Sequence, residues 1–181
     1  MASIIKANQL QDFGGNSILT SDGAGTVTVN AAAMKNTPAF EAHSNAGQSL
    51  SDNTYAKVAL QTEILDTDNN FDNSSNYRFT PTTAGKYYFE GHVRTSGSAQ
   101  SSLRNSYCAI YKNGSFYKEA RNNFGDNDIR ESSVGISAIL DMNGSSDYVE
   151  LYAAADVTTG SASLLEGTKA NYFLGYKIIG A

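Results

Sequence analysis

The chain has 181 residues, of which 40% are hydrophobic and only 17% are charged, with 11 Tyr, 8 Phe and no Trp. This length suits one all-β domain with its own core plus a short extra segment, and the neutral polar composition is typical of strands and turns rather than helices. The net charge of −5 argues against nucleic acid or an anionic membrane as a partner, because both require clustered Lys and Arg.

A single cysteine, Cys108, excludes an intrachain disulfide, so the fold depends on packing alone. Residues 1–6 have neither the charged start nor the long apolar stretch of a secretory signal, and no apolar run in the sequence is long enough to span a membrane. We therefore expect synthesis in a cytoplasm without export by a cleaved signal.

Residues 1–36 differ from the rest of the chain, because short apolar pieces at 4–5, 17–19 and 26–29 are separated by turns at 14–16 and 22–25. This pattern predicts two or three small strands. Such strands cannot bury a core by themselves, so they must pack on the main domain, on a neighbouring subunit or on another protein. We interpret residues 1–36 as an attachment segment.

Residues 37–181 alternate between apolar and polar positions in several segments, which is typical of half-buried strands. The alternation predicts a core face and a wetter face for each strand. The core positions expected are Tyr87, Phe89, Gly91 and Val93 in the segment 86–94, then Val58, Leu60 and Ile64, and Val149, Leu151, Ala153 and Ala155, with Tyr148, Glu150 and Tyr152 on the polar face.

A tight hairpin is predicted at Asn113-Gly114, which separates two such runs, 107–112 and 115–121. Both residues accept positive φ, as a two-residue type I′ turn requires. Two other segments, 134–140 and 172–179, carry apolar or aromatic residues on both faces. Since nothing in the sequence supplies a second domain to cover them, we expect another copy of the chain to do so, in a closed cyclic oligomer.

Four motifs follow one another along residues 38–180. They are Pro38-Ala39-Phe40-Glu41-Ala42, then 70–73 with 77–89, then Lys112-Asn113-Gly114, and last Phe173-Leu174-Gly175-Tyr176. In this order they resemble the opening strand, the central block, the Lys-Asn-Gly hairpin and the closing strand of the C1q-type globular domain of the C1q/TNF-like family.

This resemblance implies an all-β fold, a ten-strand jelly-roll sandwich over residues 37–181, which forms a homotrimer with its last strand beside the three-fold axis. The trimer-interface residues expected from it are Tyr172, Leu174, Tyr176 and Ile178, while Phe173 and Gly175 face the core. The alternative is that a loop of the same chain covers these four residues.

The beginning of the chain, followed by Gly-rich short strands before a C1q-like domain, resembles fibre, appendage and decoration proteins of tailed bacteriophages. Vertebrate C1q-like proteins instead reach their head domain through an export signal and a collagen stalk of Gly-X-Y repeats. The resemblance therefore implies a virion protein, assembled in the host cytoplasm, whose residues 1–36 bind other virion proteins.

Catalytic chemistry is not predicted. The only residues that titrate near neutrality are His43, at the end of a strand, and His92, on a wet strand face, and no Gly-x-Ser-x-Gly motif surrounds Ser96 or Ser137. We assign no catalytic residue, cofactor or metal ligand. A glycan-cleaving enzyme, which would require paired carboxylates in a cleft, is the least favoured hypothesis.

The acidic stretch Asp66–Asp72 begins like a calcium loop, but Phe71 and Tyr77 occupy the positions where an EF-hand requires Gly and a bidentate Glu. The resemblance permits calcium near the trimer axis without indicating a ligand set, and an Asx-rich turn is the favoured interpretation. A second polar loop is a candidate site for a sugar or a partner, the alternative being a solvated turn. Its residues are Asn122, Asn123, Phe124, Asp126, Asn127 and Asp128.

Two hypotheses for function follow. In the first, the chain is a trimeric virion protein for adhesion to a host-surface glycan or protein, or for reinforcement of the capsid or tail. In the second, it is a free carbohydrate- or protein-binding lectin or cytokine-like protein. The first predicts that residues 1–36 are required for incorporation into a particle, whereas the second predicts that they are dispensable.

Overall fold

A computed structural model of the chain describes residues 7–31, 34–167 and 169–180. Apart from a 3-10 turn at Met34, the regular elements in these residues are β-strands, numbered β1 to β16, and every strand pair is antiparallel. Across the same residues there is no helix that could span a membrane. The all-β prediction is confirmed.

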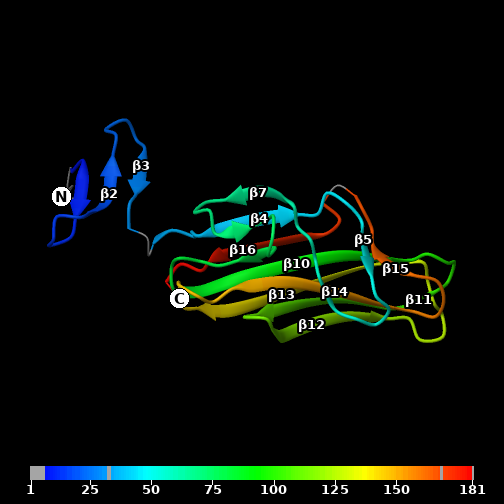
Figure 1. The fold of residues 1–181 in the computed structure, drawn as a ribbon. Helices are drawn as coiled ribbons and strands as arrows, with labels where there is room; N and C mark the ends of the chain where they lie inside the picture. Colours follow the sequence, from blue (N-terminus) through cyan, green and yellow to red (C-terminus); the bar gives the residue numbers. More distant parts are fainter. Residues whose placement is uncertain (1–6, 32–33, 168, 181) are drawn as a thin grey trace.

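Two sheets form a sandwich (Figure 1). The first, called the β16 sheet, has the order β5-β15-β10-β16-β4-β7, with β13 on the other side of β10; the second, the β14 sheet, has the order β12-β11-β14-β9-β8, with β6 also on β14. The strands of the β16 sheet are β4 (Ala39–His43), β5 (Gln48–Leu50), β7 (Thr62–Asp66), β10 (Gly85–Gly97), β13 (Glu131–Met142), β15 (Ala162–Leu164) and β16 (Tyr172–Lys177). Those of the β14 sheet are β6 (Ala56–Lys57), β8 (Phe71–Asp72), β9 (Arg78–Phe79), β11 (Leu103–Lys112), β12 (Ser115–Asn123) and β14 (Val149–Val157).

The core lies between the two sheets and is centred on stacked aromatic rings. Phe40 of β4 packs on Phe79 and Phe173, with ring centroids 4.4 and 5.2 Å away. The expected core face of β10 is confirmed, because Tyr87, Phe89 and Val93 are fully buried. Close contact of side chains across the two layers is what stabilises a sandwich of this kind.

Gly175 lies where the core leaves no room for a side chain. A Cβ atom there would approach Phe89 Cδ1 to 2.5 Å and Phe40 Cε1 to 2.9 Å. The prediction that Phe173 and Gly175 face the core is confirmed, since both are buried. The predicted hairpin is also confirmed: Lys112 pairs with Ser115, and Asn113 and Gly114 have φ values of 54° and 73°.

Two predictions about strand faces are wrong. Ile64 is 44% exposed because a bulge in the β4–β7 pairing leaves it without a partner: Glu41 pairs with Leu65, and Ala42 with Glu63. Glu150 was expected on the wet face of β14 but is only 3% exposed, because Lys57 of the neighbouring strand β6 places its Nζ within 2.5 Å of the Glu150 carboxylate.

The ten strands implied by the resemblance become thirteen in the described part of the sandwich. The additional pieces are short, since β6, β8 and β9 have two residues each. Val58 and Leu60 are fully buried, as expected, but lie in irregular backbone between β6 and β7. The layered architecture is unaffected by this subdivision.

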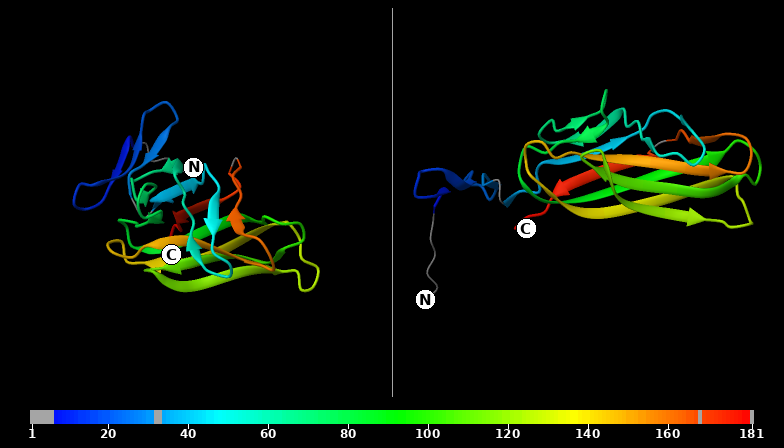
Figure 2. Two further views of the ribbon diagram at one scale, coloured as in Figure 1. Left: turned by 45° about the vertical axis from the view of Figure 1, so that its right-hand side comes forward. Right: turned by 60° about the horizontal axis from the view of Figure 1, so that its bottom comes forward.

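Residues before β4 form a separate three-stranded sheet, β1 (Gln9–Gln11), β2 (Ser17–Ser21) and β3 (Val27–Val29). The sheet projects beyond one end of the sandwich (Figures 1 and 2). None of its strand residues is buried. Two of the predicted strands and both predicted turns are confirmed, β1 was not predicted, and the apolar piece at residues 4–5 lies outside the described residues.

We call the end of the sandwich from which this sheet projects the near end, and the opposite end the far end. The near end carries the Asn113-Gly114 turn and the loop 143–148. The far end carries the loops 98–102, 124–130 and 158–161, because β10, β12 and β14 all finish there (Figure 1).

A candidate self-association face and a candidate ligand loop

The outer face of β16 points away from the core. The strand alternates, so that Tyr172, Leu174 and Tyr176 lie on the outer face. Tyr172 and Leu174 are half-buried, Tyr176 is 39% exposed, and Ile178, just after the strand, is half-buried. Tyr176 is therefore only partly covered by the part of the chain that the structure describes.

Strand register extends this surface across the sheet. Tyr176 pairs with Tyr88 of β10, Leu174 with Glu90, and Tyr172 with His92. On the other side of β10, Tyr88 pairs with Ile139 of β13, which is 56% exposed. Paired residues of neighbouring strands lie on the same face of a sheet. We define the β16 face as this continuous set: Tyr88, Glu90, His92, Ile139, Tyr172, Leu174 and Tyr176.

Glu90 is the polar centre of the β16 face. The Tyr172 hydroxyl donates to Glu90 Oε1 at 2.8 Å, and the Tyr88 hydroxyl donates to Glu90 Oε2 at 2.9 Å. The His92 ring stacks on Tyr172, with centroids 5.5 Å apart and planes 7° from parallel. A shallow hollow of about 290 Å³ lies over these residues and Ser137.

The two phenols on Glu90 stay protonated over the physiological range. Burial and then the Glu90 hydrogen bond raise the pKa of Tyr172 to about 12. The hydrogen bond to Glu90 also raises the pKa of Tyr88. Because both hydroxyls remain donors, they fix the carboxylate in one orientation. The face therefore combines apolar area with one oriented carboxylate.

Sequence reasoning found the β16 residues of this face but not their partners. Tyr88, Glu90 and His92 were expected only on the wet side of their strand, and Ile139 only in a two-faced apolar segment. The sequence feature that could have indicated this surface is an aromatic residue, Tyr88, on an otherwise polar strand face. Only the pairing of β10 with both β13 and β16 brings these side chains together.

The candidate ligand loop begins with the last two residues of β12, Asn122 and Asn123, which still pair with β11. It continues to Asp128 at the far end, opposite the β1–β3 sheet (Figure 1). Asn123, Asp126 and Asn127 are exposed. The other three residues are held by the sandwich: the Asn122 amide donates to Ser132 and Ser133, Phe124 packs on the core, and Asp128 accepts a hydrogen bond from Thr158 at 2.9 Å. The loop is thus less exposed than expected, and its free polar groups are at its tip.

The carboxylates of the acidic stretch 66–72 accept hydrogen bonds within their own turns. Asp66 accepts the backbone amides of Asn70 (3.0 Å) and Phe71 (2.8 Å), and Asp72 accepts those of Ser74 and Ser75. Backbone N–H groups therefore already occupy acceptor positions of the Asp66 and Asp72 carboxylates. Within the described ranges no cluster of three His, Cys, Asp or Glu could hold a metal. The arrangement is that of Asx-type turns.

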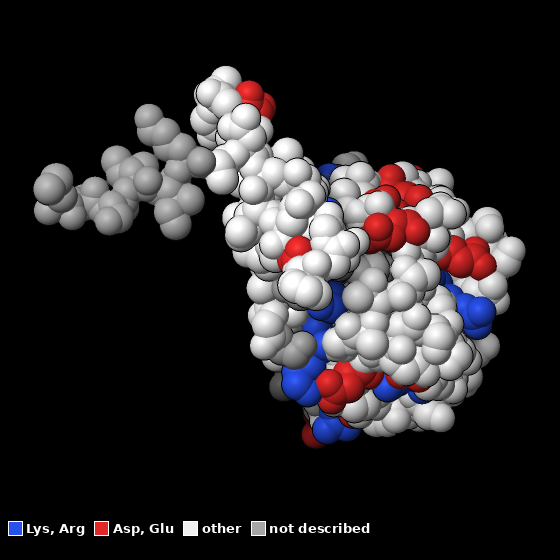
Figure 3. Space-filling model, turned by 90° about the vertical axis from the view of Figure 1, so that its left-hand side faces the viewer, with Lys and Arg blue, Asp and Glu red and all other residues white. Residues whose placement is uncertain are grey.

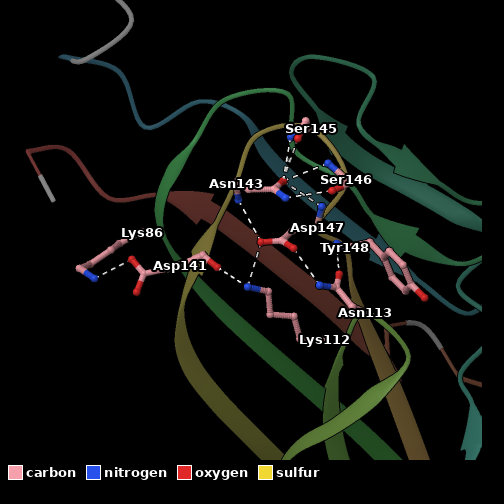
Figure 4. A network of polar contacts seen from close by, with 9 residues as sticks. All are labelled: Lys86, Lys112, Asn113, Asp141, Asn143, Ser145, Ser146, Asp147 and Tyr148. Carbon is pink, nitrogen blue, oxygen red and sulfur yellow. Dashed lines mark hydrogen bonds and ion pairs between the residues drawn. The ribbon is translucent and has the colours of Figure 1, made fainter.

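A network of polar contacts lies at the near end (Figure 4). Lys112 Nζ lies 2.9 Å from Asp147 and donates to the Asp141 carbonyl at 2.7 Å, while the Asn113 side chain donates to Asp147 and accepts from the Tyr148 amide. Hydrogen bonds from Asn113 and Lys112 lower the pKa of Asp147. Since these polar groups bind one another, the network is a structural support rather than a ligand site.

Comparison with known proteins identifies the fold. No family model and no curated protein matches the sequence. Solved structures do match: the globular domain of zebrafish complement 1qA (16% identity, TM-score 0.56, covering 78% of this chain and 98% of that one) and Eiger TNF from S. frugiperda (11%, 0.58, 79% and 93%). Murine APRIL also matches (10%, 0.55, 77% and 98%). The chain has a C1q/TNF-like jelly-roll fold.

Proposed function

We propose that this chain is a non-catalytic structural or adhesion protein of a tailed-bacteriophage particle, and that it acts as a homotrimer. The observation that carries the proposal is the division of the chain into a jelly roll with an uncovered β16 face and a small sheet that projects from one end. The first part supports self-association, and the second supports attachment to a larger assembly.

The β16 face supports self-association by its composition. It presents Tyr176 and Ile139, both substantially exposed, beside the aliphatic side chain of Leu174. Exposed apolar area of this kind in a water-soluble fold favours contact with another protein surface. A closed ring of identical copies covers such a face without leaving an open, filament-forming end. Three copies is the number that the resemblance to the C1q/TNF-like family implies.

The two ends of the molecule support two different binding roles. Residues 1–36 would bind other virion proteins at the near end, and the candidate ligand loop, with Asp126 and Asn127 at its tip, would meet a host-surface glycan or protein at the far end. On a capsid the same trimer would instead cover a three-fold position and reinforce it. Assembly would take place in the host cytoplasm.

Light scattering tests the trimer. The expected mass is about 58 kDa, three times the 19.3 kDa chain. A folded species of 19.3 kDa at micromolar concentration would overturn the proposal. The genes that flank this one test the particle assignment: portal, capsid or tail genes support it, and a neighbourhood of secretion or sugar-metabolism genes opposes it.

A free lectin or cytokine-like protein is the second candidate, favoured by the structural similarity to a complement domain and to TNF proteins. A variant with residues 37–181 only separates the two candidates. For a virion protein, the shortened chain still forms trimers but is absent from purified particles. For a free ligand, it binds its target as well as the full chain does.

A further inference from the structure

The small sheet of β1–β3 has one apolar face with no cover from the described chain. Register pairs Leu10 with Leu19, Leu19 with Val29, and Ser21 with Val27, so the four apolar residues share a face. The opposite face carries Gln9, Thr20 and Thr28, which pair with one another, and Ile18 of β2. We call the first of these the Leu19 face.

The Leu19 face is exposed to an extent that a sheet of this size does not tolerate alone. Leu10 is 53% exposed and Val27 is 58% exposed, and a hollow of about 150 Å³ lies between them. A three-stranded sheet needs a packed hydrophobic face for stability in water. Some surface must therefore cover the Leu19 face for β1–β3 to persist as a sheet.

We propose that the cover is the Leu19 face of neighbouring copies, so that the β1–β3 sheets form a second self-association site. The inference rests on the proposed trimer. Its geometric basis is continuity: the segment enters the sandwich at Ala39 of β4, which pairs with Tyr176 of the β16 face. In a ring closed through the β16 face, the three segments leave side by side at the near end.

The scarcity of charged residues in the projecting segment supports neighbouring copies of the chain as the cover of the Leu19 face. Between residues 7 and 31 the only charged side chains are Asp12 and Asp22, so the projecting segment is almost free of colour in Figure 3. Both carboxylates lie in turns, where Asp12 accepts the Asn16 amide and Asp22 accepts the Ala24 amide. The Leu19 face itself carries no charge, so copies can approach one another without repulsion.

Cross-linking of the full-length chain tests the contact. Val27→Cys places a thiol on the Leu19 face, and Thr28→Cys, the matched control, places one on the opposite face; the native Cys108 is buried. Under mild oxidation or with a short bis-maleimide, we expect covalent dimers from the first variant and on the order of tenfold slower dimer formation from the second. Equal rates within an intact trimer would overturn this inference and leave the β16 face as the site of assembly.

Hydrogen exchange tests whether neighbouring copies or another surface cover the Leu19 face. In the trimer we expect β2 amides to exchange on the order of tenfold more slowly than in a Leu174→Lys variant designed to dissociate the β16 face. Equal protection in trimer and monomer would mean that neighbouring copies do not cover the Leu19 face, and would overturn the inference. If the unmodified chain proves to be a monomer, the proposed trimer itself fails.

Discussion

Replacing Leu174 by Lys distinguishes an interface residue from a core residue on the same strand. Leu174 pairs with Glu90 on one side and with Glu41 on the other, and its side chain is half-buried in the single chain. In a monomer the new ammonium group lies between two carboxylates, an exposed arrangement worth about 0–1 kcal/mol. The fold should therefore keep its stability.

The substitution should reduce the stability of the trimer much more than that of the monomer. Covering the remaining half of a leucine side chain contributes about 1 kcal/mol, and placing an ammonium group in the contact adds a comparable desolvation cost. Over three copies this amounts to about 3–6 kcal/mol of assembly free energy. Since 1.4 kcal/mol is a factor of ten, the dissociation constant should rise by about 100- to 20,000-fold.

Sedimentation or light scattering over a concentration series measures this change, with urea denaturation as the check on folding. Phe116→Lys is the control, because Phe116 is also exposed and apolar but lies on the β14 sheet. A Leu174→Lys protein that stays trimeric at the concentrations where the unmodified chain does would refute the assignment of the β16 face. Loss of the trimer in the control alone would move the interface to the other sheet.

Three further predictions concern the fold. Gly175→Ala should lower the free energy of unfolding by about 1–3 kcal/mol in urea, because its Cβ would lie 2.5 Å from a phenylalanine ring carbon, whereas Gly135→Ala, with 3.5 Å to its nearest neighbour, should change it little. Glu150→Ala should cost about 1–2 kcal/mol in the same assay, less than for a fully buried pair because Lys57 is partly exposed. Backbone amides and an asparagine side chain hold the pKa of Asp72 below its usual value. The contribution of Asp72 to the free energy of unfolding should therefore be present above about pH 4 and be lost as the pH drops. In the same assay, Asp72→Asn should make the acid-induced loss of stability less steep.

Local patterns in the sequence were enough for much of the fold. The alternation from Lys86 to Arg94 predicts which residues enter the core, because successive side chains of a strand point to opposite faces whatever its neighbours are. The Asn113-Gly114 turn is local for the same reason, since φ preferences belong to the two residues themselves. The motifs of the closing strand likewise predicted the inward Phe173 and Gly175.

The two wrong predictions depend on contacts between segments that are far apart in the chain. Ile64 is exposed because of the bulge between β4 and β7, and no property of residues 62–66 reveals that bulge. Glu150 is buried because Lys57, from a distant segment, supplies its charge partner. Wherever the outcome depended on pairing, alternation within a single strand was not sufficient.

The sequence by itself determined the all-β class, the jelly-roll resemblance, the separate N-terminal segment and the outward residues of β16. Only the tertiary structure decided that Tyr88 and Tyr172 meet on Glu90, and that Leu10, Leu19 and Val27 share one uncovered face. The physical reason is that side-chain alternation is a property of one strand, whereas a surface is built from several. Its composition depends on register, which long-range hydrogen bonding sets only when the whole chain has folded.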